Sequence, residues 1–263
     1  MPWDITARDD VGIVTMNSNS ANVQNDGFFA DLHDAFDRLD REPRLRGVVL
    51  TAAGHIFSAG IDLKQTLPLF ASGNLDAARD FFVRYRATNL RLFTYPRPTV
   101  AAVNGHAIAG GLITALVCDF RVAADGPFRF ALNEVAIGIP MPAVYVQMLQ
   151  YALGHAQAAE LVLSGDSYDP TEGARRGLFN QVVSAEHLLD SAFARVTSLT
   201  TEALPAYAYS KRALQAPTLA AIEALANPQD DRSFAETLLD PKNLEAQADK
   251  HMGLTGRPVS DFR

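Results

Sequence analysis

Residues 99–124 read TVAAVNGHAIAGGLITALVCDFRVAA, and this stretch decides the fold class. It opens on a short apolar run and passes into a loop that starts at Asn104-Gly105. An apolar helical pattern then begins at Gly110-Gly111, and a second short apolar run closes the stretch. Buried strand, loop, helix and buried strand in this order are typical of a βαβ unit. The sequence therefore predicts an α/β protein.

The flanking sequence extends this pattern in both directions. The expected elements are a hairpin at 3–8 and 11–16, a helix at 26–41 with Asp26 as its N-cap, a buried strand at 47–52, and a long helix at 75–94. From residue 143 onward the pattern is helical, apart from a short strand near 179–183. Because no Pro/Gly/Ser-rich linker divides the chain, we expect one α/β core followed by a C-terminal helical region.

Composition excludes several classes of protein. The chain has 263 residues, 23 Lys and Arg against 30 Asp and Glu, and a formal net charge of −7. This charge argues against a general binder of nucleic acid or of an anionic membrane, which needs a basic face. Cys118 is the single cysteine, so no internal disulfide and no zinc-type ligand cluster is expected, and no metal site is predicted. We see no signal-peptide pattern, and the longest apolar run is too short to span a bilayer, so a cytoplasmic location is expected.

Two glycine-containing loops carry the candidate chemistry. The first is His55-Ile-Phe-Ser-Ala-Gly-Ile-Asp-Leu-Lys64, and the second is Asn104-Gly-His-Ala-Ile-Ala-Gly-Gly-Leu112. Each follows a buried strand and presents glycine where a helix starts, so its backbone N–H groups can approach a negatively charged group. The second loop has the glycine spacing of a P-loop but lacks its Lys and Ser/Thr, and no G-x-S-x-G elbow occurs. Taken singly, each loop is equally consistent with a tight strand-to-helix turn.

Together with two later motifs, the loops identify a family. They are followed, in order, by Cys118-Asp-Phe-Arg121 and Asn133-Glu-Val-Ala-Ile-Gly138. This arrangement resembles the crotonase superfamily, the enoyl-CoA hydratase/isomerase group, from the hairpin to about residue 225. The resemblance implies a crotonase-type core that is a spiral of ββα turns, over residues 1–195. It also implies a C-terminal helical region, over residues 196–263, that mediates trimerisation, often as a dimer of trimers.

The resemblance also implies a substrate and a site. An acyl-CoA thioester would bind with its carbonyl oxygen in an oxyanion hole formed by the backbone N–H groups of Ile61 and Gly110. Two fixed donors stabilise the enolate that forms when the thioester loses its C2 proton. Coenzyme A is part of the substrate, so no separate cofactor is expected. The implied substrate-binding residues are Ser58, Ala59, Gly60, Asp62, Leu63, Gly111 and Asn133.

The carboxylates distinguish reactions within the family. Hydratases use two glutamates, and the position of the first is Ile113 in this chain, whereas the second matches Glu134. A single glutamate resembles the Δ3,Δ2-enoyl-CoA isomerases, especially the mitochondrial type, in which one base moves a proton from C2 to C4. The alternatives are a hydratase in which another group positions water, a non-catalytic acyl-CoA-binding homologue, and a thioester hydrolase. Apolar neighbours are expected to raise the pKa of the glutamate by desolvation, namely Val135, Ile137 and Met141.

Other prominent residues receive simpler interpretations. Asp62 is expected to cap a helix that begins at Leu63, and Cys118 is expected to be a small buried hydrophobic residue. Hydrogen-bonded loop residues are expected at His55 and His106. Helix packing is expected for Phe81, Phe82 and Tyr85, with a border on the acyl-chain tunnel as the alternative. The sequence does not choose which basic residues would meet the CoA phosphates, and the candidates are Lys64, Arg97 and Lys250.

Overall fold

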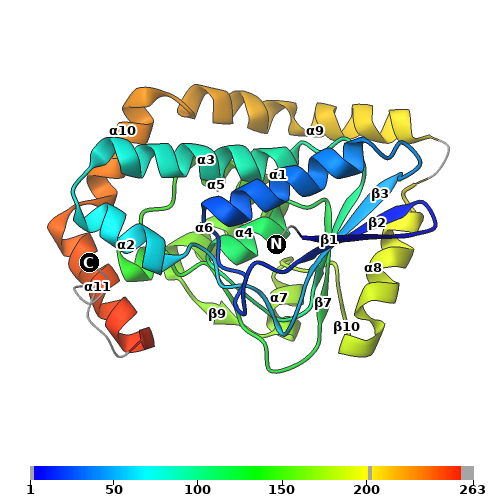
Figure 1. Cartoon of the computed structure of the whole chain (residues 1–263), viewed down its shortest axis with the longest axis horizontal. Helices are drawn as coiled ribbons and strands as arrows, with labels where there is room; N and C mark the ends of the chain where they lie inside the picture. Colours follow the sequence, from blue (N-terminus) through cyan, green and yellow to red (C-terminus); the bar gives the residue numbers. More distant parts are fainter. Residues whose placement is uncertain (1–2, 201–202, 256–263) are drawn as a thin grey trace.

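The computed structural model describes residues 3–200 and 203–255, with the side chains of the last six of these outside the description. It consists of two sheets covered by helices (Figure 1). The larger sheet has the spatial order β1 (Asp4–Arg8), β2 (Val11–Met16), β3 (Gly47–Ala52), β5 (Thr99–Val103), β7 (Phe120–Ala124) and β10 (Gln181–Val183). The smaller sheet has the order β4 (Ile56–Ser58), β6 (His106–Ile108), β8 (Phe130–Ala131) and β9 (Ser167–Tyr168).

The chain alternates between the two sheets as it advances. Strands β3, β5 and β7 of the larger sheet pair in parallel, and each is followed directly by β4, β6 or β8 of the smaller sheet. Helices separate these successive strand pairs, so the core is the spiral of ββα turns that the sequence predicts. β1 and β2 form the predicted antiparallel hairpin, and β2 continues in parallel with β3.

Helices cover the two sheets and form the C-terminal region. They are α1 (Asp26–Asp40), α2 (Leu63–Ala71), α3 (Leu75–Phe93), α4 (Gly110–Leu116), α5 (Ala143–Leu153), α6 (His155–Ser164), α7 (Pro170–Arg175), α8 (Leu188–Thr197), α9 (Leu204–Leu225), α10 (Pro228–Leu238) and α11 (Pro241–Thr255), with short 3-10 turns η1 (Val135–Ile137) and η2 (Ala185–His187). One predicted detail is wrong: the N-cap of α1 is Asn25, whose Oδ1 accepts a hydrogen bond from Phe28 N at 3.1 Å. Asp26 instead accepts from Arg84 Nε at 2.9 Å.

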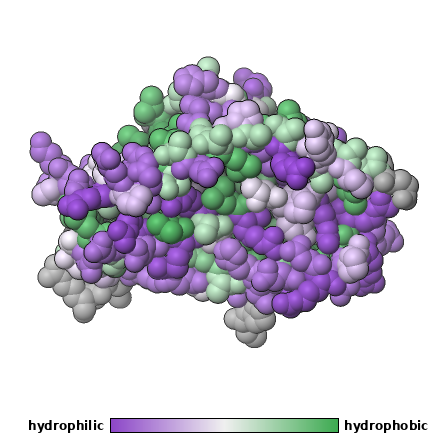
Figure 2. All heavy atoms as spheres, turned by 90° about the horizontal axis from the view of Figure 1, so that it is seen from above, coloured by the Kyte–Doolittle hydropathy of each residue, from purple (hydrophilic) through white to green (hydrophobic). Residues whose placement is uncertain are grey.

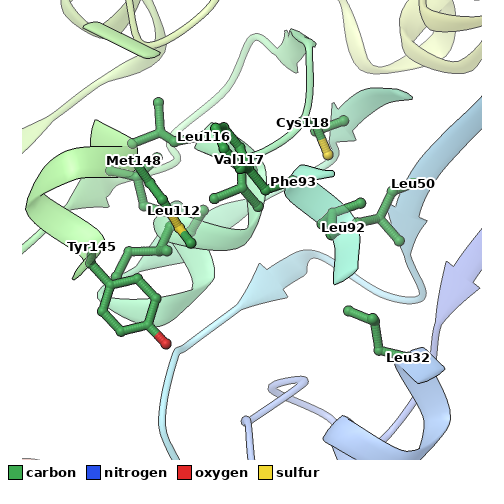
Figure 3. Packing of buried hydrophobic residues seen from close by; sticks show 14 of the residues in the cluster. Leu32, Leu50, Leu92, Phe93, Leu112, Leu116, Val117, Cys118, Tyr145 and Met148 are labelled. Atoms are coloured by element: carbon green, nitrogen blue, oxygen red, sulfur yellow. The ribbon is translucent and has the colours of Figure 1, made fainter. Parts of the chain in front are cut away.

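The main core surrounds α4, every residue of which is buried. Figure 3 shows the side chains that pack here, among them Leu92 and Phe93 of α3, Leu112 and Leu116 of α4, and Tyr145 and Met148 of α5. Cys118 is buried as predicted, and burial raises the pKa of its thiol to about 12. A second core lies on the other face of the larger sheet, where α8 packs against the valines of β2, β3, β5 and β7. Burial on both faces explains why these parallel strands are almost wholly apolar.

The C-terminal helices are fixed to this core by polar contacts. Lys211 of α9 forms a buried ion pair with Asp119 at 2.8 Å, and Tyr207 Oη donates to the same carboxylate at 3.0 Å. Helix α11 contacts both α2 and η1 of its own chain, and Gln247 Nε2 donates to Gly138 O at 3.1 Å. Figure 2 looks onto the α9 side of the molecule, where hydrophobic residues gather among hydrophilic ones. Within the described ranges, none of the helices is long and apolar enough to cross a membrane.

Candidate active site

The first glycine loop joins β4 to α2. Ser58 Oγ accepts from Gly60 N at 3.2 Å and donates to Asn22 O at 2.8 Å, which fixes the start of the loop. Gly60 has a φ of +81°, a conformation that glycine adopts readily and residues with a side chain do not. Asp62 is the N-cap of α2, as predicted, and its side chain accepts from Lys64 N at 3.0 Å. The loop therefore has one defined conformation.

The second glycine loop joins β6 to α4. Ala109 has a φ of +52°, which is strained for an alanine, and its N–H donates to Ala131 O at 2.7 Å. Helix α4 begins at Gly110 with no side-chain cap. Gly111 packs so closely on the carbonyl of Ser58 that a side chain would collide with it. Close packing on the backbone of the first loop thus explains Gly111.

The two loops bring the predicted pair of amides together. A Cβ atom on Gly60 would lie 2.9 Å from the nitrogen of Gly110, so the two loops are in direct contact. Neither the N–H of Ile61 nor that of Gly110 donates a hydrogen bond to any described residue. Two neighbouring N–H groups without acceptors are suited to hold one carbonyl oxygen on which negative charge develops.

Glu134 follows β8 and precedes η1. It is only 7% exposed, and its Oε2 has no hydrogen-bond partner within the described residues. Burial raises the pKa of this carboxyl from about 4.5 to about 7, the direction expected from the sequence. Ile137 and Met141 pack against the main core, but Val135 is 43% exposed and shields the carboxylate less than predicted.

Two further residues lie at this site: Gln24, which sequence reasoning left without a role, and Tyr85, which was expected in helix packing or at the border of the acyl-chain tunnel. Tyr85 Oη and Gln24 Oε1 both point at the α-carbon of Gly110, where a Cβ atom would lie 2.5 Å from Gln24 Oε1 and would collide with Tyr85 Oη. Both oxygens are buried without a partner in the described structure. Burial, and after it the negative charge of Glu134, raise the pKa of Tyr85 far above its usual value. The phenol therefore stays protonated, beside Gly110 and within the influence of the Glu134 charge.

The ring of Tyr85 behaves as the sequence predicts. It packs against Phe29 and Tyr145, with centroid separations of 5.7 and 5.1 Å. The sequence offered only a general reason to consider its hydroxyl: a buried tyrosine usually needs a hydrogen-bond partner. That rule applies to every buried tyrosine and does not single out Tyr85. Gln24 carried no such signal, since it stands in a polar segment before α1 with no motif around it.

The remaining predicted residues fall into two groups. His106 is hydrogen-bonded as predicted, with Nδ1 accepting from Arg129 N at 3.0 Å, but it is the first residue of β6 and not a loop residue. The carbonyl of His55 packs closely on Gly105. Asn133 is half-buried, and its Oδ1 has no partner in the described part of the chain. Of the other predicted residues, Ala59 lies in the first glycine loop and Leu63 is the first residue of α2.

The basic candidates for the CoA phosphates also differ in their surroundings. The guanidinium of Arg97 is used inside the protein, where it donates to Leu39 O at 2.9 Å. Lys64 is exposed in the first turn of α2, next to the first glycine loop. The side chain of Lys250 lies outside the described residues. Of the two described candidates, Lys64 is the one placed at the loop.

A cavity of about 240 Å³ adjoins the Tyr85 side of the site. Tyr145 links the two places, because it lines the cavity and its ring contacts that of Tyr85. The lining combines aromatic and aliphatic groups with an ion pair between Arg86 and Asp231 at 2.7 Å. Its apolar lining residues include Phe82, Met141, Val144, Leu225 and Phe234. Such a cavity can accept an apolar chain that extends from the site.

The site therefore combines two neighbouring backbone N–H groups without acceptors in the described structure with a buried carboxyl group whose charge acts on Tyr85, beside Gly110. Residues 6–251 match the family model described as enoyl-CoA hydratase/isomerase, and the chain belongs to this family. It is 34% identical over 205 residues to a probable enoyl-CoA hydratase, echA8, of Mycobacterium tuberculosis, covering 78% of this chain and 77% of that protein. It is 30% identical over 191 residues to the human mitochondrial enoyl-CoA delta isomerase 1, covering 71% and 61%.

Solved structures agree on the fold. The human mitochondrial delta3-delta2-enoyl-CoA isomerase superposes with a TM-score of 0.90 at 23% identity, over 97% of this chain and 99% of that one. A probable enoyl-CoA hydratase, EchA3, of Mycobacterium tuberculosis superposes with a TM-score of 0.81 at 26% identity, over 90% and 99%. The relatives thus carry both hydratase and isomerase names, and the family alone does not choose between the two reactions.

Proposed function

We propose that this protein isomerises 3-enoyl-CoA thioesters to 2-enoyl-CoA thioesters, with Glu134 as the only base. One observation carries the proposal: Glu134 is buried with a raised pKa, whereas Ile113, 2% exposed, fills the position at which hydratases of this family place their other glutamate. An isoleucine cannot ionise or orient water. The arrangement therefore supports a reaction that needs one proton carrier and no water.

The proposed reaction uses the two amides and the carboxylate together. The thioester carbonyl oxygen accepts hydrogen bonds from the N–H groups of Ile61 and Gly110. The carboxylate of Glu134 removes a proton from C2, and the electrons of that C–H bond delocalise onto the carbonyl oxygen as a dienolate. Glu134 then returns the proton to C4, so the double bond moves from C3=C4 to C2=C3 and the carboxylate is regenerated. Removing one such N–H donor typically raises the barrier by about 3–4 kcal/mol.

The pKa of Glu134 suits both halves of this cycle. A base is most effective when its pKa lies near the working pH, because it is then ionised often enough to accept a proton and acidic enough to return it. A pKa of about 7 meets this condition near neutrality. The apolar acyl chain would extend past Tyr85 into the cavity lined by Met141 and Phe234.

An enoyl-CoA hydratase is the second candidate. The observation that favours it is the unpartnered hydroxyl of Tyr85, which lies beside Gly110 and could hold a water molecule in place of the second glutamate. The hydratase names of several relatives agree with this candidate. In that reaction water adds its oxygen to C3 and a proton to C2, so the conjugated double bond is lost.

Absorbance separates the candidates. Isomerisation of a 3-enoyl-CoA creates the conjugated enoyl-thioester absorbance, whereas hydration of a 2-enoyl-CoA removes it. We expect growth of the signal from 3-enoyl-CoA, and its absence in Glu134→Gln. Turnover of 2-enoyl-CoA alone would favour the hydratase. Release of free thiol would indicate a hydrolase, and calorimetric binding of both thioesters without turnover would indicate a non-catalytic binder.

We also propose that the protein assembles as a homotrimer or a dimer of trimers, with residues 196–263 as its assembly region. The exposed apolar residues on α9 support this proposal, since Leu214 is 68% exposed. Sedimentation analysis of the full chain tests it, and a monomer would contradict it. The cytoplasmic location stays a prediction.

A further inference from the structure

We propose that Gln24 is a positioning residue that keeps the backbone N–H groups of Ile61 and Gly110 at the separation needed to bind one oxygen atom. The proposal rests on the proposed function only in that the N–H groups of Ile61 and Gly110 are taken to hold the thioester carbonyl. Gln24 lies just before α1, is completely buried, and contacts both glycine loops. Its main chain acts on the first loop and its side chain links the first loop to the second.

The main chain of Gln24 sets the direction of the first amide. Gln24 N donates to Gly60 O at 2.8 Å, and Asp62 N donates to Gln24 O at 2.9 Å, so Gln24 and Ile61 form an isolated parallel bridge. In a parallel ladder, the residue flanked by two such bonds directs its own N–H away from the partner strand. The N–H of Ile61 is therefore turned away from Gln24, where the described protein offers it no acceptor.

The side chain of Gln24 binds the first turn of α4, the helix that begins with the second N–H donor. Gln24 Nε2 lies 3.1 Å from Gly110 O, 2.9 Å from Thr114 Oγ1 and 3.3 Å from Ser58 Oγ. The amide nitrogen has two hydrogens, so these are shared among the three acceptors. Ser58 Oγ also accepts from Gly60 N at 3.2 Å. One buried amide group thus links the first turn of α4 to the loop that carries Ile61.

Packing alone does not explain this residue. Gln24 Oε1 is buried without a partner in the described structure, which is destabilising, and an apolar side chain of similar size would avoid that penalty. The three contacts of Nε2 explain why an amide stands here. They fix the separation of two donors that must both reach one oxygen, and misplacement by about 1 Å can lower a rate about 100-fold.

Gln24→Met tests the proposal, because methionine keeps the backbone bonds and nearly the same volume but donates no hydrogen bond. Gln215→Met is the matched control: Gln215 is also buried, and its Nε2 donates to a backbone carbonyl, Phe93 O, at 2.7 Å away from the two loops. The readout is the absorption of a bound 2,4-dienoyl-CoA. Two aligned donors polarise its carbonyl and shift its absorption to longer wavelength, whether or not the protein turns the thioester over.

We expect Gln24→Met to lose at least half of the red shift and to lower kcat by about 10- to 100-fold, with the dissociation constant of the thioester changed less than about threefold. Gln215→Met should keep the wild-type red shift. A full red shift in folded Gln24→Met, or an equal loss in Gln215→Met, would overturn the proposal. If Gln24→Met does not fold, Gln24→Asn replaces it, because asparagine shortens the side chain by one methylene and withdraws the amide from its acceptors. The same two results for the red shift would overturn the proposal. A wild-type red shift without isomerisation would instead contradict the proposed function.

Discussion

Replacing Glu134 by glutamine should stabilise the protein while abolishing its activity, and the gain should depend on pH. The substitution keeps the shape of the side chain and removes its charge. The carboxyl has a pKa of about 7 in the folded protein against about 4.5 for an ordinary glutamate. Because the folded state binds the proton more tightly, the folded wild type carries more bound protons between these two values, and its stability falls as the pH rises through this window.

The magnitude follows from the size of the shift. The pKa difference of about 2.5 lowers the unfolding free energy of the wild type by about 3 kcal/mol once the carboxyl is ionised in both states, near pH 8. At pH 5 the same effect lowers the unfolding free energy of the wild type by only about 1 kcal/mol. The advantage of Glu134→Gln over the wild type should therefore grow by about 2 kcal/mol between pH 5 and pH 8.

Thermal unfolding of the two proteins at both pH values measures this growth. For a chain of this size, about 1 kcal/mol moves the melting temperature by about 2–4 °C, so the difference should widen by about 4–8 °C. Glu223→Gln is the control, because it makes the same chemical change at an exposed glutamate. An advantage of Glu134→Gln that is the same at pH 5 and pH 8 would refute the reasoning, since it would show that the carboxyl titrates normally.

Other predictions follow from the same site. The kcat/KM for a 3-enoyl-CoA should rise with pH through about 7 and level off above it, as initial rates across this range would show, because Glu134 must be ionised to accept the C2 proton. Gly60→Ala should lower kcat at least about 100-fold with the circular dichroism spectrum unchanged, because its φ is +81° and its Cβ would lie 2.9 Å from Gly110 N. Tyr85→Phe should raise the unfolding free energy by about 1 kcal/mol in a denaturant titration, since it removes an unpartnered buried hydroxyl, and should leave isomerisation within about threefold of wild type. Met141→Trp should raise KM for long acyl chains more than for short ones in a chain-length series, because it fills the adjoining cavity.

Local patterns were sufficient for most of the fold. The hairpin of β1 and β2, the buried strand β3 and the long helix α3 each span enough residues to show a period, so their sequence predicts them. The strands of the smaller sheet have two or three residues, too few for any alternation. Residues 106–108 were expected in a loop and form β6, because parallel pairing with β4 and β8 decides their conformation.

The site was predictable to the extent that it lies in motifs. Ile61, Gly110 and Glu134 stand within recognisable motifs, and the structure brings the two glycine loops into contact. Tyr85 and Gln24 were missed as site residues because their relation to the loops exists only in three dimensions. Gln24 is 86 positions away from Gly110 in the chain, and no local pattern marks a contact of that kind.

The unpartnered groups indicate what the site is built to do. Gln24 Oε1, Tyr85 Oη and Glu134 Oε2 are buried without hydrogen-bond partners in the described structure. Gln24 and Tyr85 contact Gly110, and the charge of Glu134 acts on Tyr85, so three separate segments contribute to one region. Ala109 adds a strained backbone at the same place. Each such feature typically destabilises a protein by about 1–3 kcal/mol. A core as extensive as the one around α4 can tolerate this strain, so the site keeps buried polar groups and a strained backbone that packing alone does not require.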